Sequence, residues 1–311
     1  MTYPTAPAPL FRDPIFDGPT DPTVIYNRDE KTWWIVYTQR RANVPCHAVT
    51  WVHGTDLGVA SSDDHGQTWL YRGTLNLEPI EKGRNTFWAP EILWHENRYH
   101  MYVSYITGVP DAWRGPRHIL HYTSTNLWDW QYVSTLPLSS DRVIDACVHK
   151  TEQGFRMWYK DEAHDSHTFY ADSPDLYTWE SRGEATCDQS QEGPNVFFLG
   201  DRYWMIADIW DGQAVYHSPD LLHWTRQEEN LMAGKGNRED DGNRAHHADV
   251  LPLGDTACMF YFVHPTSDSA PKDSHMSRRS SLQAAGLVVR DGKLVSLRDE
   301  PFPFYLPTLE P

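Results

Sequence analysis

Five polar residues recur along the chain, each at the start of a short apolar run. Successive members are 70, 54, 47 and 55 residues apart, in the order Asp21, Glu91, Asp145, Glu192 and His247. Four of the five are acids, the side chains that proteins use for general acid–base catalysis. Any one of them, taken alone, is readily explained as a solvated turn residue. Their recurrence in one repeated pattern instead predicts a shared site, because gathered like charges are costly without a chemical use.

The stretch around Glu192 shows the pattern most clearly. Glu192 is followed by Gly193-Pro194, which constrains the backbone, and then by an apolar run at residues 196–199. A Gly-Asp pair at 200–201 marks a tight turn, and a second apolar run covers 203–206. Apolar runs of this length on either side of such a turn are typical of a β-hairpin. The pattern therefore predicts a strand with an acid at its start, a tight turn and a second strand.

This pattern occurs five times. The copies cover residues 21–37, 88–105, 143–159, 191–206 and 246–263. A Ser/Thr- and Asp-containing turn before a tryptophan closes the first four, at Trp69, Trp130, Trp179 and Trp224. We assign these tryptophans to packing in the outer part of each unit. Each unit has room for about four short strands, the size of a propeller blade, and residues 284–297 supply a late strand pair for the fifth.

The predicted fold is all-β, a five-bladed β-propeller with a central acidic channel. The first strand of each blade lines the axis of a propeller, so the recurring polar residues would face one another. Residues 1–19 contain five prolines, and we interpret them as an N-terminal arm. Residues 20–311 form the single catalytic propeller domain in this prediction. The arm is expected to pack on the ring or on a second subunit, giving a monomer or a homo-oligomer joined through the arm.

The composition narrows the partners. The 311 residues carry a net charge of −16, with a sequence pI near 5.3. This charge argues against nucleic acid and anionic membranes as partners and is compatible with a neutral substrate. No apolar run is long enough to span a membrane. The four cysteines show no metal-ligand spacing. The N-terminus does not resemble a signal peptide, so we expect a cytoplasmic protein as the chain stands, or a secreted one from which a leader has been removed.

Hydrolysis of a glycosidic bond is a reaction that needs facing carboxyls. One protonated carboxyl serves the leaving oxygen, and a second, ionised one serves an attacking water or the sugar itself. A separation of ~6.5–9.5 Å goes with inversion of the anomeric centre and ~5–5.5 Å with retention. A channel surrounded by blades can place two carboxyls on either side of a sugar at both distances.

Four segments together resemble glycoside hydrolase family 43 and its five-bladed relatives in families 62, 32, 68 and 117. They are Asp21-Pro22-Thr23, Trp88-Ala89-Pro90-Glu91, Ile144-Asp145 and Glu192-Gly193-Pro194. The resemblance implies a glycoside hydrolase, inverting and exo-acting, for which α-L-arabinofuranosides and β-xylosides are the first substrates to test.

Individual roles follow from the same resemblance. It makes Asp21 the general base and Glu192 the general acid. Asp145 would orient that acid and keep its pKa raised. No cofactor is required, and His247 matches a fifth-blade histidine beside a structural calcium ion in the central channel or beside its waters. For substrate binding, the resemblance adds Glu91 and His247, while positions in the chain suggest Trp88, Trp210, Asp211 and Arg244; each tryptophan is equally well explained by packing in the core.

The sequence departs from the family pattern in three blades. Blade two has Glu91 where aspartate is usual, Asp145 is followed by alanine instead of proline, and blade five has His246 and His247 in tandem. These departures keep three alternatives open. One is a family 117-like hydrolase in which His247 is the acid, another is a fructosidase-like enzyme, and the third is a propeller that binds sugar without catalysis.

Overall fold

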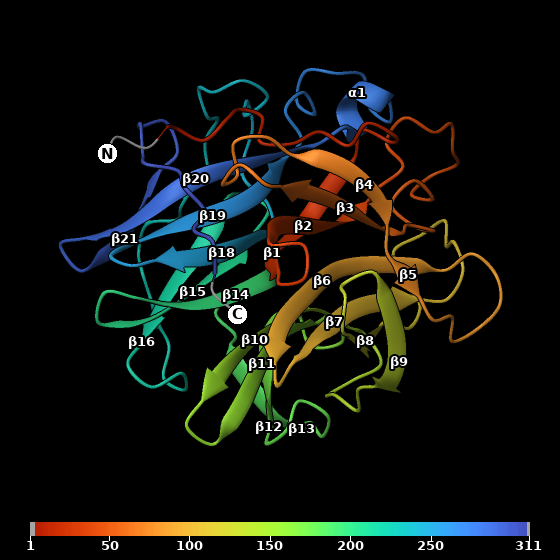
Figure 1. The fold of residues 1–311 in the computed structure, drawn as a ribbon. Helices are drawn as coiled ribbons and strands as arrows, with labels where there is room; N and C mark the ends of the chain where they lie inside the picture. Colours follow the sequence, from red (N-terminus) through yellow and green to blue (C-terminus); the bar gives the residue numbers. More distant parts are fainter. Residues whose placement is uncertain (1–3, 310–311) are drawn as a thin grey trace.

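The computed structural model describes residues 4–309. It confirms the prediction of an all-β, five-bladed β-propeller (Figure 1). Each blade is an antiparallel sheet of consecutive strands, and the innermost strands of neighbouring blades contact one another in a closed ring. Among the described residues there is a single short helix, α1 (His275–Arg278), and no helix that is long and apolar enough to cross a membrane.

The strands follow the blades in chain order. Blade one contains β1 (Pro19–Asn27), β2 (Thr32–Gln39), β3 (Leu57–Ser62) and β4 (Leu70–Thr74). Blade two contains β6 (Thr86–His95), β7 (Arg98–Ile106), β8 (His118–Ser124) and β9 (Asp129–Thr135), with β5 (Asn76–Leu77) parallel to β9 at its edge. Blade three contains β10 (Val143–Thr151), β11 (Gly154–Asp161), β12 (His167–Ser173) and β13 (Glu180–Thr186).

The last two blades complete the ring. Blade four contains β14 (Glu192–Leu199), β15 (Arg202–Asp208), β16 (Gln213–Ser218) and β17 (Thr225–Arg226). Blade five contains β18 (Ala248–Leu253), β19 (Thr256–Val263), β20 (Ser281–Arg290) and β21 (Lys293–Leu297). The late strand pair therefore supplies the two outer strands of blade five, as the sequence predicts.

A bulge interrupts the innermost strand of each of the first four blades. The register shifts after Thr20, Trp88, Ile144 and Glu192, and the next residue has positive φ, 49° at Asp21, 45° at Ala89, 62° at Asp145 and 54° at Gly193. Such a bulge re-aims a side chain. The structure corrects the sequence alignment here, because Glu91 lies two residues after the repeated position and Glu192 one residue before it.

Polar side chains beyond the bulges connect neighbouring blades near the axis. The Val148 amide of blade three donates to Glu91 Oε1 at 2.7 Å, and the Val24 amide of blade one donates to Asp249 Oδ2 at 2.7 Å. Burial, followed by repulsion from Asp249, raises the pKa of Glu91 well above its usual value. Glu91 thus caps a backbone group of the next blade, which satisfies an amide that water cannot reach.

Apolar side chains fill the spaces between blades. Trp34, Trp158 and Trp204 are fully buried, each within a different cluster. The four predicted outer tryptophans all pack against apolar clusters between blades. The indoles of Trp69, Trp130 and Trp179 each donate to a carbonyl three residues earlier in the turn. The tryptophan repeat of the sequence is therefore a packing feature, and in the first three blades it also fixes the turn.

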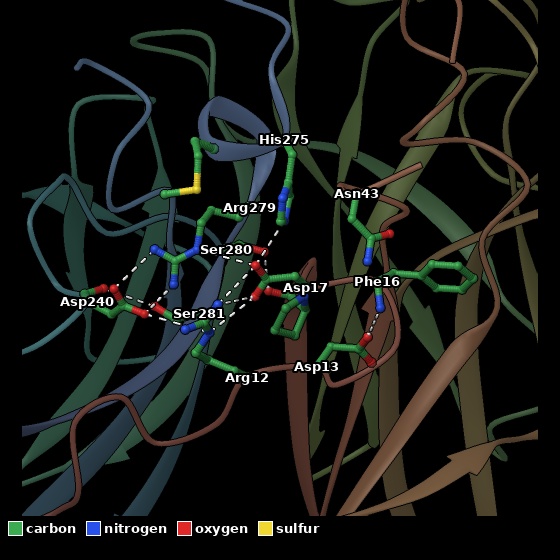
Figure 2. Close-up of polar contacts among 12 residues, drawn as sticks. Arg12, Asp13, Phe16, Asp17, Asn43, Asp240, His275, Arg279, Ser280 and Ser281 are labelled. Atoms are coloured by element: carbon green, nitrogen blue, oxygen red, sulfur yellow. Dashed lines mark hydrogen bonds and ion pairs between the residues drawn. The ribbon is translucent and has the colours of Figure 1, made fainter. Parts of the chain in front are cut away.

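The N-terminal arm packs on the ring of its own chain. The arm pairs with β20 through the backbone. The Leu10 amide donates to the Leu282 carbonyl at 2.8 Å, and the Leu282 amide donates to the Phe11 carbonyl at 2.9 Å. The Asp17 carboxylate of the arm forms ion pairs with Arg12, His275 and Arg279 (Figure 2). The nitrogen–oxygen distances are 2.9, 3.0 and 3.4 Å, respectively. Because blade five takes its four strands from the C-terminal part of the chain, these contacts help to hold blade one against blade five.

Candidate active site

A pocket of about 390 Å³ opens where the innermost strands begin. Six of the residues predicted for the site line it: Asp21, Trp88, Asp145, Glu192, Trp210 and His247. The pocket also contains the cations Arg40 and Lys160 and a fourth acid, Glu162. Its walls therefore carry both signs of charge at close range.

Asp21 is buried and held by donors from blade one. The Thr20 hydroxyl donates to its Oδ2 at 2.9 Å, and Arg40 Nη2 lies 3.3 Å from the same oxygen. Burial raises the pKa of Asp21, but the charges of Arg40 and His247 and the threonine hydrogen bonds outweigh it, and the net pKa is lowered. Asp21 is consequently ionised at neutral pH, which a general base requires.

Asp145 is repelled by the negative charges of both Asp21 and Glu192. Its Oδ2 accepts the Gly193 amide at 3.1 Å, and its own amide donates to Ser104 Oγ at 2.9 Å. Burial is the largest influence and raises the pKa of Asp145 to about 7, with further repulsion from Glu192 and Asp21. Near neutral pH this carboxyl therefore carries a proton for much of the time.

Glu192 faces two donors across the pocket. Lys160 Nζ lies 2.9 Å from its Oε2, and the Trp210 indole donates to its Oε1 at 3.1 Å. Burial raises the pKa of Glu192, but the charge and hydrogen bond of Lys160 outweigh it, so the net pKa is lowered. The proton that the resemblance implies for Glu192 is thus held on Asp145 in this arrangement, because the nearest cation belongs to Glu192.

His247 directly precedes β18, the innermost strand of blade five, and its ring contacts both aspartates. Its Nδ1 lies 3.8 Å from Asp21 Oδ1 and 4.0 Å from Asp145 Oδ2. Its amide donates to Asp208 Oδ2 at 3.0 Å, and the preceding His246 ring lies 3.1 Å from the same oxygen. Burial lowers the pKa of His246, but Asp208 outweighs it and the net pKa is raised. The His247 ring therefore lies within 4.0 Å of a carboxylate oxygen of each aspartate.

The other predicted binding residues lie outside the pocket lining. Arg244 Nε pairs with Asp211 Oδ1 at 2.7 Å, and both side chains are largely exposed. Glu91 points to the amide of Val148, as described above. The structure thus separates these three residues from the acids with which the sequence groups them, and their substrate-binding roles remain predictions.

The predicted calcium ion also remains a prediction. Within residues 4–309, no group of three or more His, Cys, Asp and Glu side chains is arranged to hold a metal ion. His247 has carboxylates of Asp21 and Asp145 as its neighbours, and these are engaged by Arg40 and by the Gly193 amide. No chemistry of the site is therefore derived from a calcium ion.

Sequence analysis missed several residues of the pocket. They are Arg40, Lys160, Glu162, Phe262 and His264. Arg40, Lys160 and Phe262 lie at or just after the ends of the second strands β2, β11 and β19. Because neighbouring antiparallel strands bring the end of the second beside the start of the first, charged residues at second-strand ends were the available signal.

Solved structures of glycoside hydrolases share this architecture. A thermostable family-43 glycoside hydrolase has a TM-score of 0.68 and 18% identity, over 94% of this chain and 99% of that one. A family-32 β-fructofuranosidase from Bombyx mori has a TM-score of 0.68 and 12% identity, over 97% and 65%. An α-L-arabinofuranosidase from Lactobacillus brevis has a TM-score of 0.64 and 14% identity, over 94% and 98%.

Comparison of structures finds similar proteins, whereas comparison of sequences does not. No protein-family model and no curated protein sequence matches the chain. The matches to solved structures nevertheless extend over nearly the whole chain, so the likeness concerns the complete ring and not one blade. The chain therefore has the five-bladed β-propeller fold that is found in glycoside hydrolases of families 43 and 32.

Proposed function

We propose that this protein is a glycoside hydrolase that cleaves a neutral oligosaccharide or glycoside in the pocket containing Asp21, Asp145 and Glu192. The observation that carries the proposal is the arrangement of these three carboxyls. They come from three blades, line one pocket, and differ in their protonation. Hydrolysis of an acetal requires an ionised carboxylate and a carboxyl that can supply a proton, on two sides of one bond.

Asp21 is the proposed base. Held ionised by Arg40, it takes a proton from a water whose oxygen forms the new bond to the anomeric carbon. The bond from that carbon to the leaving oxygen breaks, and the leaving oxygen receives a proton from Glu192, which takes this proton from Asp145 beforehand. Asp145 and Glu192 repel each other electrostatically, so they titrate as a pair that holds one proton near neutral pH. Asp145 is the proton's position in the ligand-free pocket.

An exo-acting, inverting reaction is the proposed mode. The pocket volume of about 390 Å³ lies in the range of sites that enclose a small ligand, which suits the end of a sugar chain. The structural neighbours carry the names α-L-arabinofuranosidase, β-xylosidase and β-1,3-galactosidase. Arabinofuranosides, xylosides and galactosides are accordingly the sugars to test, and the anomer first formed, observed by NMR, distinguishes inversion from retention.

The test is a panel of nitrophenyl glycosides with the wild-type protein, Asp21→Asn, Glu192→Gln and the matched control Glu180→Gln. Glu180 is an exposed acid of β13. We expect the wild type to hydrolyse at least one member of the panel. Asp21→Asn and Glu192→Gln should each lower turnover by ~10²-fold or more, whereas Glu180→Gln should not. Full activity of Asp21→Asn would refute the assignment of the base.

One observation favours a second candidate function, a propeller that binds sugar without cleaving it. The ion pair between Lys160 and Glu192 neutralises the carboxylate that would otherwise act as the acid. This alternative predicts that calorimetry detects binding of an oligosaccharide to the wild type while no reducing sugar is released over days.

The position of His247 supports a different hydrolytic mechanism, in which this histidine is the proton donor. Its ring contacts both Asp21 and Asp145, so His247 itself could supply the proton, as the family 117-like alternative requires. In that case Glu192→Gln would retain most of its turnover, and His247→Gln would lose it. The two variants measured side by side therefore identify the proton donor.

A further inference from the structure

One position of the second strands differs between blade three and its neighbours. It is the residue that pairs with the last residue before the bulge. In three blades this residue accepts a main-chain N–H from the next blade: Thr38 from Ala89 at 2.8 Å, Ser104 from Asp145 at 2.9 Å, and Asp208 from His247 at 3.0 Å. Blade three has Lys160 at this position. A lysine has no acceptor, so it cannot make the contact that connects the other blades.

The main-chain amide of blade four that has no acceptor at the lysine position donates to a pocket acid instead. Gly193 of blade four donates to Asp145 Oδ2 at 3.1 Å, and Lys160 is free to reach into the pocket instead. The lysine is 5% exposed. Its ammonium group lies 2.9 Å from Glu192 Oε2 and 3.4 Å from Glu162 Oε1. A buried lysine is retained as a cation only when carboxylates compensate its lost hydration.

Glu162 does not need the lysine for its own charge balance. Arg117 Nη1 lies 2.6 Å from Glu162 Oε2, and Arg142 Nη2 lies 3.5 Å from the same oxygen. Two arginines therefore already neutralise Glu162. The remaining positive charge of Lys160 acts on Glu192, for which it is the nearest cation.

The groups that act on Glu192 come from five elements. They are Lys160 of β11, Asp145 of β10, Asp21 of β1, the Trp210 indole after β15, and the two histidines before β18, His246 and His247. Asp145 and Asp21 favour the protonated form of Glu192. Lys160 opposes them at hydrogen-bond distance, so its removal changes the balance at Glu192 more than the loss of any other single cation.

We propose that Lys160 is a positioning residue that holds Glu192 ionised in the free protein and so sets the upper pH limit of catalysis. The proposal rests on the hydrolytic function argued above. A second effect follows from the geometry, because Lys160 and the Trp210 indole bind different oxygens of Glu192. They fix the plane of that carboxylate before a substrate binds, which lowers the entropy cost of orienting Glu192 for the reaction.

The direction of the pH effect follows from the charge. The alkaline limb of kcat/KM reports loss of the proton shared by Asp145 and Glu192. A nearby cation favours the ionised form and lowers the pKa of this pair. Without that cation the pair keeps its proton to higher pH, so the limb moves upward. An opposite charge at this distance typically shifts a carboxyl pKa by 1–3 units, and we expect a shift of ~1 pH unit or more.

The experiment compares wild type with Lys160→Met, Lys160→Arg and the control Lys150→Met, an exposed lysine of β10. With the most active nitrophenyl glycoside, Lys160→Met should move the alkaline limb up by ~1 pH unit or more. Lys160→Arg, which preserves the charge, should restore the wild-type limb, and Lys150→Met should leave it in place. A limb that is unchanged in a folded Lys160→Met protein would overturn the proposal.

A second readout separates this proposal from the proposed function. Side-chain carboxyl titration by ¹³C NMR, with Glu192→Gln to assign the Glu192 signal, follows protonation without any substrate. A higher Glu192 midpoint in Lys160→Met supports the role of Lys160 even if no glycoside is cleaved, in which case only the hydrolase assignment fails. An equal midpoint in the two proteins contradicts the role of Lys160 whatever the activity.

Discussion

Three acids of one pocket differ because each has different neighbours. Asp21 has Arg40, and Glu192 has Lys160 and the Trp210 indole. Asp145 accepts a main-chain amide, and the groups that favour its ionised form, His247 and Lys160, act on it without a side-chain hydrogen bond. Full burial would raise the pKa of all three, and only the two with strong donors escape it. The difference in protonation among the three acids is thus set by cations near the ends of the second strands.

Trp210 tests this view at the scale of one hydrogen bond. Trp210→Phe keeps an aromatic ring but removes the N–H donor to Glu192, and a hydrogen bond to a charged group contributes ~1.5–3 kcal/mol. We expect kcat to fall roughly tenfold with little change in KM, because the ring remains as a surface for the sugar. Trp210→Ala should in addition raise KM. Equal kinetics for Trp210→Phe and wild type would show that the indole N–H does not assist Glu192.

At the scale of the element, the bulge is what turns a strand toward the pocket. It gives Asp21 and Asp145 a left-handed backbone, with φ of 49° and 62°. L-residues adopt this conformation at a cost, and such strain gathers at functional sites. In blade four the same place is Gly193, and a Cβ there would lie 2.5 Å from the His247 ring. Blade four can therefore present Glu192 beside His247 only because its bulge residue is glycine.

Gly193→Ala should accordingly damage the site without unfolding the ring. The added methyl group displaces His247, and a ~1 Å displacement of a catalytic group can cost ~10²-fold in rate. The matched control is Gly183→Ala in β13, where φ is also positive, 124°, but a Cβ would have no neighbour within 4 Å. Both variants place a side chain at a positive φ, and only Gly193→Ala adds a contact with the His247 ring. Comparable kcat/KM values for the two would contradict the steric argument.

At the scale of the whole molecule, the ring is closed by its ends. The arm lies on blade five, while Phe302, Phe304 and Leu306 of the C-terminal tail join Leu10 and Phe11 in one apolar cluster with residues of blades one and five. Asp17 and Asp240 bind Arg279 together in Figure 2. The contacts hold the seam between the first and last blades, next to the strand that carries Asp21.

Asp17→Asn tests how much the ionic contacts of the arm contribute. Asparagine tolerates the left-handed backbone of this position, φ 53°, so the substitution removes charge with little added strain. Arg279 would lose one partner in a buried setting, and we expect the free energy of unfolding to fall by about 2 kcal/mol. Glu300→Gln, which breaks the exposed pair with Arg290, should change it by well under 1 kcal/mol. Urea denaturation that gives equal values for both variants would contradict a stabilising role for the arm.

The sequence by itself determines the ring and the chain positions of its acids. The hairpin pattern recurs at blade length, and local periodicity of apolar residues is sufficient to define strands and their order. It also specifies Asp21, Asp145 and Glu192 as pocket residues, because each stands at the start of an innermost strand. Glu91 matched the pattern equally well, yet a bulge moves it two residues along the strand and onto the Val148 amide.

Only the tertiary structure decided how the acids are protonated. The cations concerned, Arg40 and Lys160, lie near the ends of second strands, a position that places them beside the innermost strands but does not say which acid each one contacts. Electrostatic influence depends on distance and burial through space, and the distances of 3.3 and 2.9 Å to Asp21 and Glu192 exist only in the assembled ring. The repeat in the sequence therefore specified that Asp21, Asp145 and Glu192 share one pocket, while the packing of the blades set the charge that each one carries.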